Sequence, residues 1–511
     1  MQKTLDNFLD VILATLDQSL RLLFRSDSLK KRPWFSRLWL AGLFVAGIGL
    51  WGIFFNWGAF PLNYKDWANV TGPRLALLQD AIKKNSLPLH TAKPDVPMSS
   101  ITDRYLSIPD PVLSPQVLLL GFISINQFIL VDVLLLYAAG FFGLLWFMRK
   151  FSLSLIAFSI LFVLFNFNGN ILAHYAIGHF SWGGYFLFPW LAALAFLLVE
   201  GERGWGWIAK MSLLLFAIIL QGSFHQFVWC LIFIGFLALV RRAAFWTAVG
   251  GATFGVLVSM VRILPPALMY GKFSIVYKAG YQNLSDLWFS MVNTLELGAK
   301  VTVPMMAQAV QPWELTMYVS LIGAVFLLYF GIYRWLSREG GDNPYLRLAF
   351  PVFGMFLLSF DLIFKVLRRF PIPLLEGERV PARIISLTFV FVLLFAVIEF
   401  QRWLNQPHKN DLVVQLTSIG LLMVGGNDLW QNYRAWRISR VSTIYPQVSF
   451  NRLDYYIVNH SDPPYITAIA LGTAISILSI AVVLFLAYWQ RKHPSKRENL
   501  SKTIEDEKIL G

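Results

Sequence analysis

Apolar runs of about 20 residues, each long enough to span the hydrocarbon core of a bilayer as one helix, recur along most of this chain. Loops rich in Lys and Arg follow every second run, and such loops stay on the cytoplasmic side. The pattern predicts an all-α polytopic membrane protein with about 12 transmembrane helices. Basic residues at 30–32 and after the last run predict that both ends of the chain are cytoplasmic.

The composition excludes several functional classes. Of 511 residues, 57% are hydrophobic and 14% are charged, whereas soluble domains carry about 25% charged residues. The net charge of +14 fits cytoplasmic loops and anionic membrane lipids, so we expect no nucleic-acid partner. The single cysteine, Cys230, excludes an intrachain disulfide and a Cys-based metal site. The sequence has no P-loop, dinucleotide-binding or HExxH motif, so ATP hydrolysis, redox and metalloprotease chemistry are unsupported.

Hydropathy divides the chain into three parts. Residues 1–32 carry apolar side chains at helical spacing and predict a cytoplasmic amphipathic helix, either on the membrane or packed on the bundle. Residues 33–490 form the transmembrane bundle, and residues 491–511 form a basic cytoplasmic tail. Four segments of the bundle are expected as external loops, namely 57–112, 266–312, 365–383 and 429–463.

The first external loop carries the acid that we consider the centre of function, Asp66. It lies in the motif YKDW, where flanking aromatics predict partial desolvation and a role as a base. The alternative is a solvated acid that caps a turn. Asp103 is a second candidate in the same loop, although it could instead pair with Arg104. Residues 73–82 predict a short amphipathic helix along the outer leaflet, with Thr71 as its cap.

Two later segments add polar groups at the expected outer ends of helices. The motif HYAIGHFSWGG contains His174, His179 and Trp182, which either line a polar substrate pocket or form a structural turn. The i, i+5 spacing of the histidines differs from the same-face i, i+4 pair of zinc sites, so we predict no zinc there. His225 lies in a polar break between two short spans, and such a break favours the wall of a cavity.

A basic segment before the tenth span breaks the charge rule for external loops. Its cations suit a phosphate or pyrophosphate, since Arg can bond two oxygens at once. The alternative is an interfacial patch of salt bridges. The candidate phosphate-binding residues are Lys365, Arg368, Arg369, Arg379 and Arg383.

Two charged residues fall inside or near the ends of spans. Asp132 and Arg262 each cost a few kcal/mol at a helix centre, so each should face the protein interior and find a partner. A structural ion pair and a role in a transport pathway both remain open.

Several of these segments together resemble a known family. The first loop ends in NSLPLH and is followed by an SP entry to the next span; HYAIGHFSWGGYFLFPWLAAL and ERVPARIISLTFVFVLLFA come later. This combination over residues 35–400 resembles the bacterial multi-spanning GT-C glycosyltransferases, especially their YfhO-like members. The resemblance implies inverting transfer of a sugar from a polyprenyl-phosphate donor to a lipid, glycan or protein acceptor, at the outer face of the bacterial inner membrane.

The resemblance also implies roles for residues. Asp66 matches the family's acid in the first external loop, which serves as a base or helps to hold a divalent cation such as Mg²⁺ or Mn²⁺. The adjacent acid pair of many relatives is missing here, which bears on metal dependence. Arg379 and Arg383 best match the family's donor phosphate ligands. The prenyl tail of such a donor would need an apolar lateral groove between helices.

Two other functions fit the same features. A transporter or lipid flippase would use the polar breaks and the external cations, with Asp132 as the site of ion coupling; the apparent lack of an internal repeat counts against it. A non-enzymatic subunit of a membrane complex would use the loops as docking surfaces.

Overall fold

The structure is a computed structural model in which the regular elements of the described residues are helices, joined by loops with a few isolated β-bridges. The described residues are 20, 22–26, 31–92, 102–108, 110–268, 280–294, 311–337, 343–370, 378–407 and 411–493. Most of the predicted N-terminal amphipathic helix, of the C-terminal tail and of the 266–312 loop lies outside them.

Eight helical stretches of the described chain are long and apolar enough to cross a membrane. They are Pro33–Phe54 (α3), Ile125–Lys150 (α5), Leu155–Ile177 (α6 and α7), Phe180–Glu200 (η5 and α8), Pro312–Arg334 (α14, α15 and η7), Pro381–Leu404 (η9 and α19), Asp411–Trp436 (α20) and Pro463–Lys492 (α22). A ninth stretch consists of two helices bent by 68°, α11 (Phe245–Val258) and α12 (Met260–Ala267).

Three shorter apolar helices complete the bundle, namely Trp205–Leu220 (α9), Phe224–Val240 (α10) and Pro344–Leu358 (η8 and α16). These stretches coincide with the twelve apolar runs of the sequence. The chain is therefore an all-α, multi-pass membrane protein, while the exact number of spans stays a prediction because three of the helices are short.

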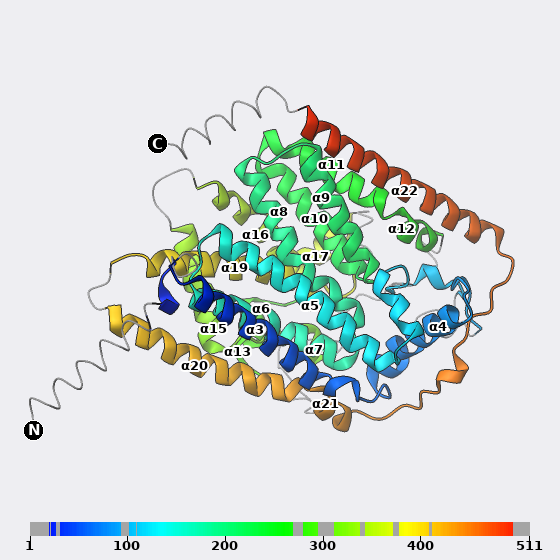
Figure 1. Ribbon diagram of the computed structural model, residues 1–511, viewed down its shortest axis with the longest axis horizontal. Coiled ribbons are helices and arrows are strands. Elements are labelled where there is room, and N and C mark those ends of the chain that lie inside the picture. Colours follow the sequence, from blue (N-terminus) through cyan, green and yellow to red (C-terminus); the bar gives the residue numbers. More distant parts are fainter. Residues whose placement is uncertain are drawn as a thin grey trace, which may run out of the picture.

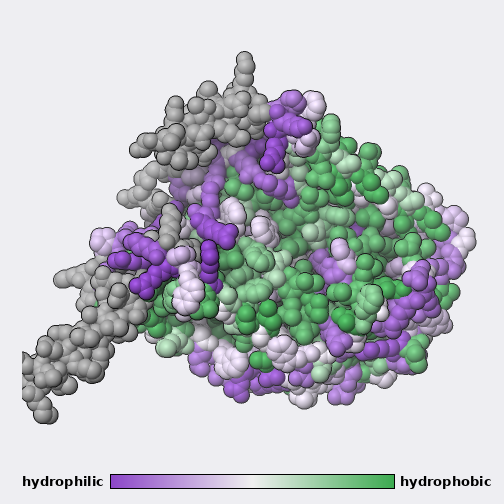
Figure 2. Space-filling model, in the orientation of Figure 1, coloured by the Kyte–Doolittle hydropathy of each residue, from purple (hydrophilic) through white to green (hydrophobic). Residues whose placement is uncertain are grey.

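The surface agrees with this assignment. Figure 2 shows hydrophobic side chains over the middle of the visible face, with hydrophilic side chains gathered at its margins. Helix α19 (Ile385–Leu404) is central and has nearly all its side chains buried, whereas α20 and α22 expose most of theirs. Figure 1 shows α20 and α22 on opposite flanks of the bundle. Their exposed apolar faces fit contact with lipid.

One end of the bundle, here called the polar end, receives the first loop. This loop runs through η2 (Trp67–Thr71) and α4 (Gly72–Lys83), and Figure 1 shows α4 beyond the ends of α5 and α7. The side chains of Tyr64 and Trp67 both donate hydrogen bonds to the carbonyl of Ala176, over 2.8 and 3.2 Å. The loop is thus packed onto the bundle through named contacts at the end of α7.

The helix predicted at 73–82 is confirmed as α4, but its expected position along the outer leaflet is wrong. Leu75, Leu77 and Leu78 are all buried inside the protein, so α4 has no free apolar face for lipid. Thr71 stands at the N-cap position of α4 as predicted, but its hydroxyl donates to the carbonyl of Gly178 over 2.7 Å instead of capping the helix.

Local sequence explains why spans break at the polar end. Asn168 separates α6 (Leu155–Phe167) from α7 (Gly169–Ile177), and its side chain accepts from the backbone of Asn170 and Ile171 as an N-cap. Gly178 ends α7 with φ of +100°, a conformation that favours glycine. A Cβ on Gly178 would lie 2.4 Å from the backbone nitrogen of Trp67. This glycine therefore allows the first loop to approach the end of α7.

Candidate functional site

Asp66 and His179 are joined at the polar end, although they come from different loops. Oδ2 of Asp66 lies 3.0 Å from Nε2 of His179, and the Asp66 side chain is 38% exposed. Among the described residues, His179 supplies the hydrogen bond that holds this carboxylate. One carboxylate oxygen of Asp66, Oδ2, is therefore held by His179, while the partly exposed carboxylate remains accessible to a ligand.

The charges around Asp66 keep it ionised. Burial alone would raise the pKa of Asp66, but the hydrogen bond and charge of His179, with the charges of Arg383 and Arg74, outweigh it. The pKa of Asp66 consequently lies below its ordinary value. The Asp66 carboxylate is therefore ionised at neutral pH.

A second imidazole supports His179 from the other side. Nδ1 of His174 lies 2.6 Å from Nδ1 of His179, so one nitrogen must donate and the other accept. His179 therefore contacts Asp66 through Nε2 and His174 through Nδ1. Nε2 of His174 is buried without a hydrogen-bond partner among the described residues. The two histidines orient Asp66 as a short chain of hydrogen bonds.

Trp182 forms the floor below this chain. Its ring stacks on His174 with centroids 3.6 Å apart, and its indole N–H donates to Asn170 over 3.2 Å. The guanidinium of Arg383 lies 5.4 Å from the centroid of the same ring. The aromatic ring thus joins the histidines to the cation of η9 (Pro381–Ile384).

Glu314 and Arg383 form a buried ion pair between two short helices, α14 (Pro312–Leu315) and η9. Nε and Nη2 of Arg383 donate to the two carboxylate oxygens over 2.5 and 2.6 Å. Both side chains are about 95% buried. Arg383 therefore belongs to the cluster, but Nε and Nη2 of its guanidinium already donate to Glu314.

Glu378 is the second buried acid of the cluster. It accepts from the indole N–H of Trp229 over 2.9 Å and from the backbone of Val380 over 3.0 Å, and it lies 3.1 Å from Nδ1 of His225. Burial opposes ionisation, but His225, Arg383 and these hydrogen bonds lower the pKa of Glu378 to about 2. The predicted polar break at His225 thus faces the same cluster.

A further set of charges lies behind Asp66. The carboxyl of Asp110 contacts the hydroxyl of Tyr105, and burial raises its pKa despite the charges of Arg74 and Arg262. Arg262 donates to the carbonyls of Leu106, Ile108 and Asp110 over 2.7–3.0 Å. The predicted interior position of Arg262 is confirmed, and its partners are the backbone of the first loop.

Asp132 is also interior, as predicted, with 2% of its surface exposed. It is hydrogen-bonded to Gln116 rather than ion-paired with Arg262. Its Oδ1 has no hydrogen-bond partner among the described residues.

The predicted phosphate-binding cations are not all together. Lys365 and Arg369 are exposed and Arg368 is half-buried; Lys365 pairs with Asp361 over 2.6 Å. Arg379 is half-buried beside Glu378, and no described residue holds its side chain in a hydrogen bond or ion pair. Of the five, Arg383 lies in the buried cluster and Arg379 at its edge.

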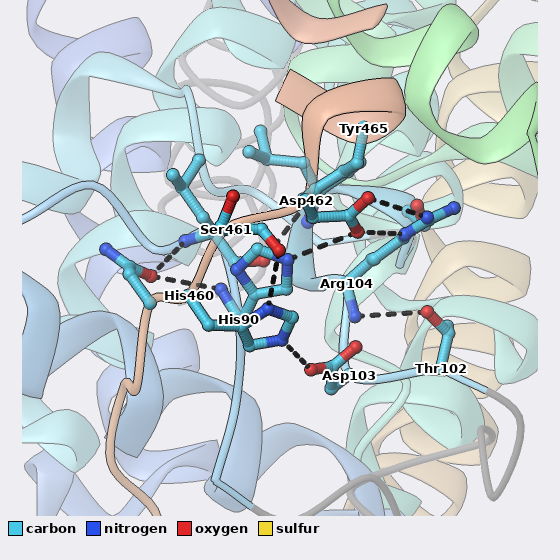
Figure 3. A network of polar contacts seen from close by, with 12 residues as sticks. His90, Thr102, Asp103, Arg104, His460, Ser461, Asp462 and Tyr465 are labelled. Atoms are coloured by element: carbon cyan, nitrogen blue, oxygen red, sulfur yellow. Dashed lines mark hydrogen bonds and ion pairs between the residues drawn. The ribbon is translucent and has the colours of Figure 1, made fainter. Parts of the chain in front are cut away.

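Asp103 belongs to a separate network. Its carboxylate lies 2.6 Å from Nε2 of His460, while Arg104 binds Asp462 instead, with Nε and Nη2 distances of 2.6 and 2.9 Å (Figure 3). The alternative that Asp103 pairs with Arg104 is therefore wrong. Nothing joins Asp103 to Asp66 among the described contacts.

His174, His179 and Glu314 each offer a ligand atom within 4.8 Å of the others. Two of these ligands are imidazoles, whereas Mg²⁺ and Mn²⁺ prefer oxygen. The third is already neutralised by Arg383, whose positive charge would oppose a cation. The set does not fit the Mg²⁺ or Mn²⁺ that the family resemblance implies.

An apolar groove of about 770 Å³ runs between α6, α15 (Ser320–Phe326), η7 (Leu327–Arg334), α19 and α20. Leu321, Val325 and Leu421 in its wall are about half exposed, so it opens to the side of the bundle. The lining includes Val319 and Ser320, which follow Glu314 closely in the chain. The groove continues along the helices to Phe400 and Trp403 of α19.

Sequence reasoning missed Glu314. It is an acid between Pro312-Trp313 and an apolar run, and an acid in the opening turn of a span should have indicated a buried partner. Trp229 and Arg74 were also missed, because an aromatic in an apolar helix and a cation in a loop are common.

A scan against models of protein families finds no match for this chain. Searches of curated proteins and of solved structures find none either.

Proposed function

We propose that this protein is a membrane glycosyltransferase that moves a sugar from a polyprenyl-phosphate donor to a lipid, glycan or protein acceptor. The observation that carries the proposal is the half-open Asp66 carboxylate, held by His179 at the edge of a buried charged cluster. Under this proposal the polar end faces the outer side of a bacterial inner membrane, and both chain termini are cytoplasmic.

The chemistry assigned to Asp66 is general base catalysis. As the hydroxyl oxygen of the acceptor forms a bond to the anomeric carbon, its proton passes to Asp66. The bond between that carbon and the phosphate oxygen breaks, and polyprenyl phosphate leaves with the electron pair. Attack from the side opposite the leaving group inverts the anomeric centre. His179 and His174 act as positioning residues for Asp66.

Arg379 is the best candidate ligand for the donor phosphate. It is half-buried, close in sequence to Glu378 and Arg383, and not engaged by a described residue. Arg383 adds positive charge nearby, but its own hydrogen bonds go to Glu314. A guanidinium with free N–H groups can bond two phosphate oxygens.

The apolar groove supports a prenylated substrate. Its wall is almost entirely apolar, with Ile160, Leu164, Ile322 and Leu422 among its residues. It opens to the side of the bundle, where a lipid could enter, and its lining includes Val319, which follows Glu314 closely in the chain. A flexible hydrocarbon chain would bury apolar surface there while its head group remains at the polar end.

The test uses purified full-length protein in lipid nanodiscs. It is incubated with a panel of radiolabelled polyprenyl-phosphate sugars and an extract of bacterial membrane lipids and glycans as acceptors. The proposal predicts labelled product from wild type and loss of that product with Asp66→Asn. Equal product from both proteins, or no release of polyprenyl phosphate from any donor, would overturn it.

One observation favours a second function. The buried Asp132 has an oxygen without a hydrogen-bond partner among the described residues, a feature that suits ion coupling in a transporter or flippase. That function predicts that Asp132→Asn abolishes lipid or solute movement in proteoliposomes, while Asp66→Asn has little effect. The transferase proposal predicts instead that Asp66→Asn abolishes sugar transfer, while Asp132→Asn has little effect on it.

A further inference from the structure

We propose that His90, Asp103 and His460 form a binding site for a divalent transition-metal ion, with Zn²⁺ as the preferred ion. One ligand atom from each residue lies within 4.8 Å of the other two. The site is separate from the cluster around Asp66, and the inference does not depend on the proposed function.

The three ligands come from two distant parts of the chain. His90 and Asp103 belong to the first loop, while His460 precedes α22. Figure 3 shows the imidazoles of His90 and His460 beside each other, with Asp103 next to His460. The ring centroids are 3.8 Å apart, and Nε2 of His460 lies 2.6 Å from the Asp103 carboxylate.

His90 is prepared as a ligand by its surroundings. Its Nε2 lies 3.4 Å from Oδ2 of Asp462, and that carboxylate is fixed by two hydrogen bonds from Arg104. A metal-binding histidine commonly donates its second ring N–H to a carboxylate, which leaves the other nitrogen unprotonated. In His90 that other nitrogen is Nδ1.

The position of the buried Nδ1 of His90 is not explained by a hydrogen bond to any described residue. The His90 side chain is fully buried, and its Nδ1 has no hydrogen-bond partner among the described residues. A buried polar atom without a partner costs about 1–3 kcal/mol. Bonding to a metal ion would satisfy this nitrogen, which gives a second reason for the site beyond the cluster itself.

The ligand types select the ion. Two imidazoles and one carboxylate suit Zn²⁺, which takes three protein ligands and leaves a fourth position open to water. Ligand atoms around such an ion lie about 3.4 Å apart for bonds of about 2.1 Å. His460 and Asp103 are 50% and 32% exposed, so these two side chains can close on the fixed His90. Their exposure also gives the ion a path from solvent.

The ion would join two segments that already contact each other. The backbone of Val458 donates to His90 and that of Ala92 donates to Tyr456, over 3.1 Å in both cases. The side chain of Asn459 accepts from the backbone of Leu89 and His90. A metal ion here would fasten the first loop to the segment before α22.

The test measures zinc binding by the full-length protein in nanodiscs, purified through a tag without histidine and stripped of metal by a chelator. Zinc is titrated in competition with a chromophoric chelator. His460→Ala and Asp103→Asn are the test variants, because the His460 side chain is 50% exposed and Asp103→Asn keeps the shape of its side chain. His493→Ala and Asp454→Asn are matched controls from the exposed end of α22 and the same external segment.

We expect one zinc equivalent to bind at least tenfold more weakly in both test variants than in wild type, with the controls unchanged. Zinc should raise the melting temperature of wild type more than that of His460→Ala. A His179→Ala background separates this equivalent from any zinc at the other histidine pair. Zinc affinity and stoichiometry equal in wild type and both test variants would overturn the proposal and leave Asp103 and His460 as an ion pair.

Discussion

Arg383 and Glu314, 69 residues apart in the chain, meet in a buried ion pair with two parallel hydrogen bonds of 2.5 and 2.6 Å. The pair joins η9 to α14 under the polar end of the bundle. It also sets the charge around Asp66 and Glu378, since Arg383 lowers the pKa of both acids.

The ion pair predicts a large loss of stability when one partner is removed. Arg383→Ala removes the guanidinium that donates both parallel hydrogen bonds to the buried Glu314, which costs about 3–5 kcal/mol of unfolding free energy. The double variant Arg383→Met with Glu314→Gln should recover much of that loss. The control is Lys210→Ala, which breaks an exposed pair with Glu202 and should cost less than about 1 kcal/mol. Denaturation in mixed micelles measures all three; equal losses in Arg383→Ala and Lys210→Ala would refute this role.

The lowered pKa of Glu378 predicts that the free energy of unfolding decreases at acidic pH. Its pKa falls from 4.5 to about 2 in the folded protein. Because the folded value is the lower one, its stabilisation is complete above about pH 4.5 and disappears as the pH falls to about 2; the full effect is about 3 kcal/mol. Glu378→Gln should therefore lose less stability than wild type across this window, whereas Glu202→Gln should follow wild type. The measurement is the unfolding free energy of each variant as a function of pH. Parallel curves for wild type and Glu378→Gln would contradict the stabilising role of ionised Glu378.

Arg379 predicts an effect on donor binding. Arg379→Ala should raise KM for the polyprenyl-phosphate sugar at least tenfold, with a smaller change in kcat, because it removes phosphate contacts present throughout the reaction. Arg379→Lys keeps the positive charge but cannot bond two phosphate oxygens at once, so its KM should lie between those of wild type and Arg379→Ala. Arg369→Ala removes an exposed cation of the same segment and serves as the control. Similar KM values for Arg379→Ala and Arg369→Ala would exclude Arg379 as the ligand.

The apolar groove predicts discrimination by chain length. A Cβ on Gly426, in the groove wall, meets no atom within 4 Å, so Gly426→Trp can fill the groove with little strain on the helix. The variant should transfer poorly from a long-chain donor and nearly normally from a short-chain one. Gly420→Trp is the control, since Gly420 is equally unobstructed but outside the groove wall. Equal loss with both donors would indicate general damage instead.

The sequence predicted the helices well because a bilayer fixes their length and leaves few alternatives to a helix. The short helices α9 and α10 agree with the predicted break at His225. The position of α4 could not be predicted, because an amphipathic pattern does not distinguish a lipid surface from a protein surface. Its apolar face at Leu75 and Leu78 packs inside the protein.

The candidate site was predicted in its members but not in its pairings. Asp66, His179 and Arg383 each stood out as polar residues beside apolar spans, and the structure brings them into one cluster. Spacing along the sequence could not reveal that Glu314 would meet Arg383. Asp103 looked like an equivalent acid of the same loop, yet it meets His460 from the other end of the chain.

The most direct test of the central claim compares donor binding and transfer in one preparation of wild type and Asp66→Asn. Asparagine keeps the shape of the side chain but cannot take the proton of the acceptor. If Asp66 is the base, the affinity for the donor should stay within about threefold, while turnover should fall by about 10²–10⁴. Turnover by Asp66→Asn within tenfold of wild type, at unchanged donor affinity, would contradict the account.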